Sequence, residues 1–203
     1  MRGLYAVKPW FVRRLRGAED EMVARGVSAD AVTVAAVVVS IGAGLVIALG
    51  GLLDVEALWF LVPPLVVIRL ALNALDGSIA RRTGTARPFG AALNEAGDRL
   101  SDAATIGATA FVVQPALAIT AVAAAFAASL FGVVSMALTG SRDSGGPMGK
   151  ADRAALLAVG AFLAAVAGST LPFTVVLWIV LLGSVATAGL RIARCHRVLE
   201  GSR

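Results

Sequence analysis

The sequence predicts an all-α integral membrane protein, a six-transmembrane-helix bundle with an N-terminal amphipathic interfacial helix. Apolar residues make up 58% of the 203 residues and charged residues only 15%, and the mean hydropathy is +0.84. A soluble domain carries about 25% charged residues, so this chain has too little polar surface for a water-soluble globule. Six apolar segments also approach the roughly 20 residues that cross a bilayer. Basic residues, finally, concentrate in alternate loops, as in membrane proteins.

Residues 1–27 are expected to form a juxtamembrane segment. Within it, the stretch near 5–25 mixes basic residues with bulky apolar ones, and the acidic run Glu19, Asp20 and Glu21 follows. This pattern predicts a helix that lies in the headgroup layer. A solvated basic arm is the alternative interpretation.

The membrane domain is expected at 28–193, and residues 194–203 are expected to form a cytoplasmic tail. The six expected spans are 31–53, 57–76, 88–113, 115–139, 152–171 and 173–193. The pair Pro63-Pro64 should kink the second span. The third span is the most polar of the six, as expected for a helix that lines a water-filled site.

The distribution of basic residues predicts the orientation. With the N-terminus inside, the inner segments hold every Lys and Arg except Arg69 and Arg99, which lie within spans. The outer loops hold Asp54 and Glu56 and no basic residue. Both termini are therefore expected on the cytoplasmic side of the cytoplasmic membrane, and Trp59 is expected to be an outer interfacial anchor.

The tail holds the only cysteine and the only histidine, Cys195 and His196. A single cysteine excludes an intrachain disulfide and a cysteine-rich zinc site. Neither residue is expected to be catalytic, since both lie among solvated arginines near the C-terminus.

One stretch places polar and acidic residues at helical spacing in this apolar chain. It reads Asp76-Gly77-Ser78-Ile79-Ala80-Arg81, then eight residues, then Gly90-Ala91-Ala92-Leu93-Asn94-Glu95-Ala96-Gly97-Asp98. Ionisable groups at membrane depth are costly unless they face a cavity or a partner, which makes them candidates for function. Asn73 and Asp76 lie one turn apart, and Asn94, Asp98 and Asp102 recur every four residues, so each set shares a helix face. The short loop 82–87 should bring both faces to one pocket.

The stretch resembles the signature of the CDP-alcohol phosphotransferase family, D-x2-D-G-x2-A-R-x8-G-x3-D-x3-D. The residues that match in identity and spacing are Asp76, Gly77, Ala80, Arg81, Gly90 and Asp98. Asn73 and Asn94 stand where the first and third Asp belong. Residues 26–33 weakly resemble the entry into the family's first membrane helix.

The resemblance implies a metal-dependent transfer of a phosphatidyl, or substituted phosphoryl, group from a CDP-linked lipid to an alcohol in phospholipid synthesis. CDP-diacylglycerol would be the lipid donor, CMP would be released, and Asp98 would be the general base. By the same resemblance, the residues around the nucleotide would be Gly77, Ala80, Arg81 and Gly90, with Thr33 a weaker candidate. Close helix packing is the alternative role of the small residues.

The resemblance also implies two divalent ions, Mg²⁺ or Mn²⁺, and carboxylate and amide oxygens suit such hard cations. The expected ligands are Asn73, Asp76, Asn94 and Asp98, with Glu95 and Asp102 as candidates to restore the charge lost at the two Asn. The alternatives are that Glu95 and Asp102 pair with Arg99 or Arg69, or that the site is inactive.

Three basic residues, Arg142, Lys150 and Arg153, flank the glycine-rich loop 144–149. The loop is not a phosphate-binding P-loop, because Ser144 and Ala151 replace required residues. The basic residues could bind a phosphate on the acceptor alcohol. Loop charges that merely follow the positive-inside rule are the alternative.

Two other functions stay open. Asn94-x3-Asp98-x3-Asp102 resembles the diphosphate-binding motif of UbiA-type prenyltransferases, although that interpretation leaves residues 76–81 unexplained. A catalytically inactive homologue that binds lipid or a partner is the other. No nucleic-acid partner is expected, and glycerol phosphate, inositol phosphate, serine and other alcohols are all possible acceptors. Family resemblance suggests a homodimer, and the small residues Ala124, Ala128 and Gly132 permit close helix contact.

Overall fold

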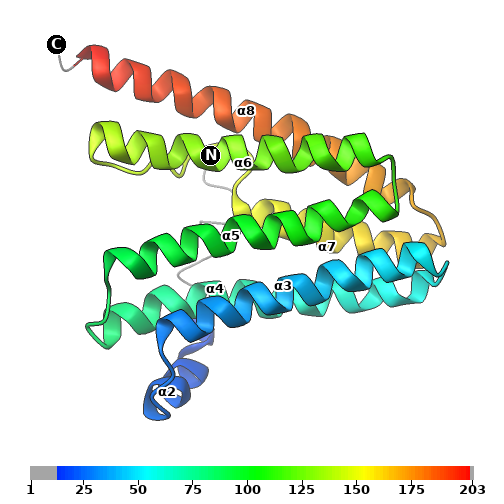
Figure 1. Ribbon diagram of the computed structural model, residues 1–203, viewed down its shortest axis with the longest axis horizontal. Coiled ribbons are helices and arrows are strands. Elements are labelled where there is room, and N and C mark those ends of the chain that lie inside the picture. The colour runs from blue at the N-terminus through cyan, green and yellow to red at the C-terminus, as the bar shows by residue number, and fades with distance from the viewer. Residues whose placement is uncertain (1–12, 202–203) are drawn as a thin grey trace.

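The computed structural model describes residues 13–201, and every regular element in that range is helical. The elements are α2 (Arg16–Ala24), α3 (Ala29–Leu52), η2 (Glu56–Leu61), α4 (Val62–Arg82), α5 (Pro88–Ala108), η3 (Thr109–Phe111), α6 (Pro115–Thr139), α7 (Lys150–Ala167) and α8 (Leu171–Gly201). The long helices lie side by side along the longest axis, and the short α2 lies apart near one end (Figure 1). The expected all-α class is confirmed.

Four helices are long and apolar enough to cross a membrane: α3, the η2–α4 unit, α6 and α8. The other two long helices, α5 and α7, have 21 and 18 residues, and each 18-residue stretch of them holds at least three charged residues. In α5 these are Glu95, Asp98, Arg99 and Asp102. By length and composition, four helices thus qualify as membrane spans, and the expected number of six stays a prediction.

The N-terminal amphipathic segment is only partly described, because residues 1–12 lie outside the described range. The remainder forms α2, which docks on α4. Glu19 of α2 is buried and accepts a hydrogen bond from the Ser78 hydroxyl at 2.9 Å. Asp20 forms an ion pair with Arg82 at the end of α4. These contacts fix α2 beside the signature, and its position in the headgroup layer stays a prediction.

The prolines of the second span start a helix. Pro63 and Pro64 lie in the first turn of α4, directly after the 3₁₀ segment η2. Proline is well tolerated there, since the first-turn N–H groups have no partner within the helix. The second span thus changes from 3₁₀ to α-helix at these prolines, and a kink there stays a prediction.

Two helices extend past their expected ends. The second span was expected to end at residue 76, yet α4 continues to Arg82. The last span was expected to end at residue 193, and α8 continues through most of the tail. The signature aspartate of α4 therefore lies well inside the bundle.

The core consists of two helix groups joined by α7. α3 packs along both α4 and α5, whereas α6 packs along α8, and α7 contacts members of both groups. Gly44 permits the closest approach: a Cβ there would lie 2.3 Å from the Ala104 carbonyl oxygen. This close contact holds α3 against α5 behind the polar residues of the signature.

Trp59 lies inside the bundle and is 1% exposed. Its indole N–H donates to the Ile47 carbonyl oxygen at 3.2 Å, and its ring meets Phe173 edge-on with centroids 5.2 Å apart. Gly50 leaves room for the indole, since a Cβ there would lie 2.3 Å from Nε1. The prediction of an outer interfacial anchor is therefore wrong, because the indole finds its hydrogen-bond acceptor inside the protein.

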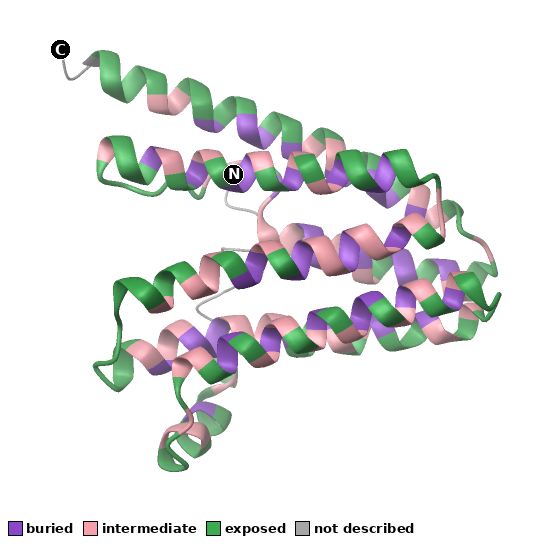
Figure 2. Ribbon diagram, in the orientation of Figure 1, coloured by how far each residue is buried: buried purple, intermediate pink, exposed green. Residues whose placement is uncertain are grey.

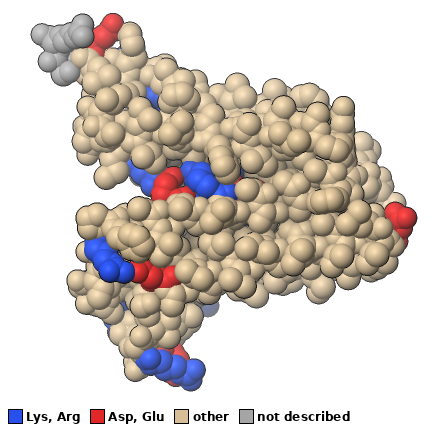
Figure 3. Space-filling view, viewed as in Figure 1, with Lys and Arg blue, Asp and Glu red and all other residues tan. Residues whose placement is uncertain are grey.

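Large apolar side chains cover the outward faces of the long helices. Val38, Leu45 and Leu182 are each about 60% exposed, and Figure 2 shows exposed residues along the outer sides of the helices. Figure 3 shows wide areas of this face without charged side chains, while the charged ones gather mainly in a hollow and toward one end. Such a surface suits the hydrocarbon core of a bilayer.

Candidate functional site

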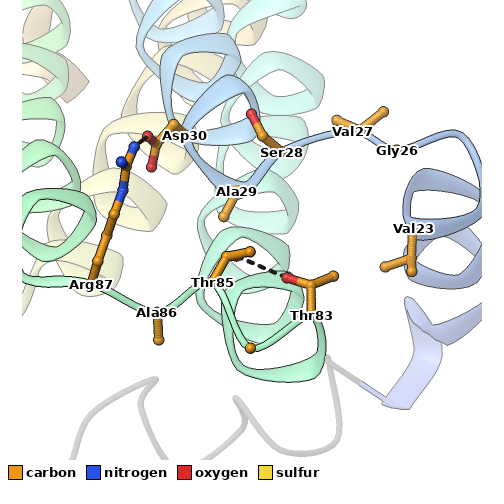
Figure 4. Close-up of a pocket in the computed structure, with 11 residues that line it drawn as sticks. Val23, Gly26, Val27, Ser28, Ala29, Asp30, Thr83, Thr85, Ala86 and Arg87 are labelled. Carbon is orange, nitrogen blue, oxygen red and sulfur yellow. Dashed lines mark hydrogen bonds and ion pairs between the residues drawn. The ribbon is translucent and has the colours of Figure 1, made fainter.

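The polar faces of α4 and α5 meet near the turn between these helices, at the end of the bundle that we call the signature end. The turn comprises residues 83–87, and Gly84 adopts a positive φ of 68°. The hydroxyls of Thr83 and Thr85 share a hydrogen bond of 2.8 Å, which Figure 4 draws as a dashed line. The turn reverses the chain, yet α4 and α5 each pack along α3 and not closely along each other. The expected close neighbourhood of these two helices is therefore wrong, and they are linked by side chains, from Asn73 to Asp98 and from Asn94 to Asp76.

Asp76 is buried where three elements converge. Its carboxylate accepts a hydrogen bond from the Thr33 hydroxyl of α3 at 3.0 Å. It also accepts hydrogen bonds from the Asn94 amide of α5 and from the Gly77 backbone N–H. Asp76 is therefore fixed by neutral donors, as a buried carboxylate requires.

Asp98 is also buried, at 3% exposed, and has a cationic partner. Its Oδ1 accepts a hydrogen bond from the Asn73 amide of α4 at 3.3 Å. Its Oδ2 lies 2.5 Å from the Lys150 ammonium at the start of α7. The two Asn that depart from the signature thus each donate to one of the two Asp that remain.

Asp102, one turn deeper in α5, forms a buried ionic triad. Arg69 of α4 approaches it at 3.1 Å and Arg153 of α7 at 2.6 Å, and all three residues are at most 2% exposed. Arg153 also donates to the Met148 carbonyl at 3.4 Å. The triad joins three helices and lies outside the open cleft described below. Asp102 therefore pairs with Arg69, as one of the sequence alternatives has it.

Glu95 pairs with two arginines. It lies 2.7 Å from Arg99 on its own helix and 2.6 Å from Arg142 in the loop before α7. The pairing with Arg99 is again the alternative that the sequence left open. The pairing with Arg142 joins α5 to the loop between α6 and α7.

A cleft of about 320 Å³ opens at the signature end between α3, α4, α5 and the start of α7. Its lining includes the predicted residues Thr33, Asn73, Asp76, Gly77, Ala80, Arg81, Gly90, Asn94, Arg142 and Lys150, and also Asp30 and Arg87. Figure 3 shows acidic and basic side chains side by side in a hollow at this end of the bundle. Arg153, by contrast, does not line the cleft, since it is buried with Asp102.

Arg81 and the glycines define the rim of the cleft. Arg81 is exposed and lies over Gly77, where a Cβ would come within 3.3 Å of its Nη1. A Cβ at Gly90 would come within 3.3 Å of the Asp30 carboxylate. Both glycines therefore keep the rim open beside charged groups.

A second cleft of about 650 Å³ adjoins the first and shares its wall. Figure 4 shows its lining, from Val23 of α2 to Arg87 in the turn. Arg87 forms an ion pair with Asp30 of α3, drawn there as a dashed line, and both residues line both clefts. The sequence analysis did not predict this pair. It could have been suspected from Asp30, which stands where an Asn is common in the CDP-alcohol phosphotransferase family.

The loop between α6 and α7 is held by arginines of α8 that sequence reasoning also missed. Arg191 donates to the carbonyl oxygens of Gly145 and Ala128, and Arg194 pairs with Asp143 at 3.1 Å. A Cβ at Gly132 would lie 3.0 Å from Arg191 Nη1. Ala128 and Gly132 of the small-residue row thus make contacts within one chain. The position of Arg191 inside an apolar span could have indicated that it has a buried partner.

No three acidic, histidine or cysteine side chains among residues 13–201 lie close enough together to hold a metal ion. One signature carboxylate, Asp76, lines the cleft, and the other, Asp98, is buried behind the lining residues Asn73 and Lys150. Asn94 and Asn73 turn amide N–H groups toward these two carboxylates. The ammonium of Lys150 lies against Asp98. This donor set carries too little negative charge for two divalent ions.

The chain is similar to known membrane proteins over nearly its whole length. It is 32% identical over 199 residues to the inner membrane protein YnbA of Escherichia coli (strain K12), which covers 97% of this chain and 96% of that protein. No model of a known protein family matches the sequence.

Solved structures with the same fold include the phosphatidylinositol phosphate synthase PgsA1 of Mycobacterium tuberculosis. Its form with CDP-DAG bound superposes with a TM-score of 0.75 at 20% identity, over 90% of this chain and 94% of that one. Its complex with manganese and citrate superposes with a TM-score of 0.74 at 22% identity, over 88% and 87% of the two chains.

Proposed function

We infer from the signature residues and the shared fold that this chain is a CDP-alcohol phosphotransferase, and we propose that it transfers the substituted phosphoryl group of a CDP-linked lipid to an alcohol. CDP-diacylglycerol is the proposed donor and CMP the leaving group. The observation that carries the proposal is the burial of both Asp76 and Asp98 at the signature end: Asp76 lines the cleft, and Asp98 contacts the lining residues Asn73 and Lys150. Both occupy signature positions, and one of the similar structures holds CDP-DAG.

Asp98 is the proposed general base. Its carboxylate takes the proton from the acceptor hydroxyl, and the alcohol oxygen forms a bond to the lipid-side phosphorus. The bond from that phosphorus to the CMP oxygen breaks, and CMP leaves with the electron pair. Asn73 and Lys150 hold one oxygen of Asp98 each, which fixes the direction of the carboxylate.

Asp76 and the rim residues are proposed to bind and orient the donor. Thr33, Gly77, Ala80 and Gly90 line the cleft with small side chains, so a substrate can approach the backbone. Arg81 is exposed on the rim and is proposed to grip a phosphate with its guanidinium. The role of Asp76 is to keep these elements together, since α3, α4 and α5 all contribute to its hydrogen bonds.

A divalent ion is not assigned a role in this proposal. One of the similar structures holds manganese, and the ligands expected here are Asn73, Asp76, Asn94 and Asp98. Two carboxylates beside an ammonium do not fit a pair of divalent ions. Glu95 and Asp102 do not supply the missing charge either, because arginines pair with both.

The orientation is proposed from charge. The signature end holds Arg81, Arg82 and Arg87, whereas the loop at the other end holds Asp54 and Glu56. We place the signature end on the cytoplasmic side, where a soluble alcohol reaches the cleft and CMP returns to the cytosol. Both termini then lie in the cytoplasm, and a homodimer stays a prediction.

An inactive homologue that binds CDP-lipid is the second candidate. The ion pair between Asp98 and Lys150 favours it, because the ammonium occupies the carboxylate oxygen that would otherwise be open to an acceptor hydroxyl. A prenyltransferase site has less support, since the third residue of its motif, Asp102, is held by Arg69 and Arg153.

The test is CMP release by the purified protein in lipid nanodiscs, with CDP-diacylglycerol and a panel of free and phosphorylated alcohols. Each reaction is run with Mg²⁺, with Mn²⁺ and with a chelator. We expect release with at least one alcohol and its loss in Asp98→Asn. The matched control is Asp54→Asn, an exposed residue at the far end whose φ of 53° asparagine tolerates. Binding of CDP-diacylglycerol without release under any condition identifies the inactive homologue.

A further inference from the structure

We propose that the Lys150 ammonium takes the place of the divalent cations in this site, so that phosphoryl transfer here needs no metal ion. This inference rests on the proposed function. Its first support is the position of Lys150, the first residue of α7, whose Nζ lies 2.5 Å from Asp98 Oδ2. Lys150 also lines the same cleft as Asp76. One cation thus contacts one signature carboxylate and shares a cleft with the other.

The second support is the pairing of the amides. The signature would place four carboxylates here, and this chain has two carboxylates and two asparagines. Asn94 donates to Asp76 and Asn73 donates to Asp98. Each asparagine amide therefore donates a hydrogen bond to a carboxylate oxygen that would otherwise be free to bind a metal ion. The two substitutions and the lysine form one consistent set.

The third support is the charge of the cleft. Its basic residues are Arg81, Arg87, Arg142 and Lys150, and its acidic residues are Asp30 and Asp76, with Asp98 buried behind Lys150. Basic groups thus outnumber acidic groups, whereas two divalent ions require an excess of carboxylates. A diphosphate carries about two negative charges and suits a cleft that is already cationic.

The chemistry does not change when an ammonium replaces a metal ion. Lys150 offers three N–H donors that can neutralise phosphate oxygens as charge develops on them. The proton still passes from the alcohol to Asp98, the new oxygen–phosphorus bond still forms, and CMP still leaves. Lys150 is anchored for this task, because Asp152 caps the start of α7 by accepting from the Gly149 N–H at 2.9 Å.

The first experiment is direct Mn²⁺ binding by electron paramagnetic resonance on the wild-type protein in nanodiscs, alongside CMP release. We expect no stoichiometric Mn²⁺ site and a rate unchanged by chelator. The triple variant Asn73→Asp, Asn94→Asp, Lys150→Met restores the signature charges and is expected to bind Mn²⁺. Stoichiometric Mn²⁺ on the wild-type protein, or CMP release abolished by chelator, overturns the inference and leaves the proposed function intact.

The second experiment removes the ammonium. Lys150→Met is expected to lower the rate of CMP release by about 10²-fold or more, the effect of losing one charge-stabilising donor. Lys150→Arg should keep part of the rate, and Arg197→Met, which removes a charge from the exposed tail, should keep all of it. An unchanged rate in Lys150→Met contradicts the inference. If the wild type releases no CMP under any condition, the proposed function fails, and Mn²⁺ binding still decides the metal question.

Discussion

The amide nitrogen of Asn94 on α5 donates a hydrogen bond to the buried carboxylate of Asp76 on α4. These residues are 18 positions apart and meet because the turn at 83–87 reverses the chain and α4 and α5 both pack along α3. The contact joins a signature residue to one of the two departures from the signature. It also makes Asn94 the most informative position at which to change the charge of the site.

Asn94→Asp should destabilise the protein, because it sets a second carboxylate against buried Asp76. We expect the free energy of unfolding to fall by about 2 kcal/mol and Mn²⁺ to restore it. The measurement is thermal unfolding in detergent, with and without Mn²⁺. Asn94→Ser is the control, since it loses one hydrogen bond without adding charge and should cost about 1 kcal/mol. Equal stability of the two variants would count against this electrostatic account.

Arg69→Met should destabilise the bundle by about 3–5 kcal/mol, because it breaks a buried ionic group and leaves Asp102 with only Arg153. Thermal unfolding measures this loss. Arg25→Met, which removes an arginine from an exposed pair with Glu21, is the control and should cost less than about 1 kcal/mol. A small effect at Arg69 would mean that the triad does not join α4, α5 and α7.

Gly44→Ala should separate α3 from α5, because its Cβ would meet the Ala104 carbonyl oxygen at 2.3 Å. We expect a loss of about 1–3 kcal/mol in stability, as for other overpacked cores. Gly42→Ala is the matched control, two residues earlier on the same helix, where a Cβ meets nothing within 4 Å. Similar unfolding temperatures for both variants would contradict the close packing of these helices.

The single native cysteine allows a test of orientation. Cys195 is partly exposed on the last turns of α8, so a membrane-impermeant maleimide should label it only after cells are permeabilised. In a Cys195→Ser background, Asp54→Cys should be labelled in intact cells. Labelling of Cys195 in intact cells would place the C-terminus outside and reverse the proposed orientation.

Much of the site followed from spacing along the chain. The four-residue period of α5 and the short turn after α4 predicted that polar side chains of the two helices meet, and Asn94 does contact Asp76, as Asn73 contacts Asp98. Those are local properties of helices, so one sequence suffices to predict them.

The ionic partners did not follow, because they depend on packing between distant segments. Lys150 meets Asp98 across 52 positions, and Arg153 meets Asp102 across 51. The sequence offered several basic residues for each carboxylate and no means to choose among them. Trp59 was misplaced for a similar reason: its acceptor, the Ile47 carbonyl, lies on a neighbouring helix. Helix packing, which sequence spacing does not encode, decides each of these contacts.

The central claim is that this cleft transfers a phosphoryl group to an alcohol with Asp98 as the base. The most direct measurement is mass spectrometry of the lipid formed from CDP-diacylglycerol and the deuterium-labelled form of the best acceptor. We predict one labelled phosphatidyl alcohol for each CMP released by the wild-type protein, and none from Asp98→Asn. Unlabelled phosphatidic acid as the only product, or equal labelled product from Asp98→Asn, would contradict the claim.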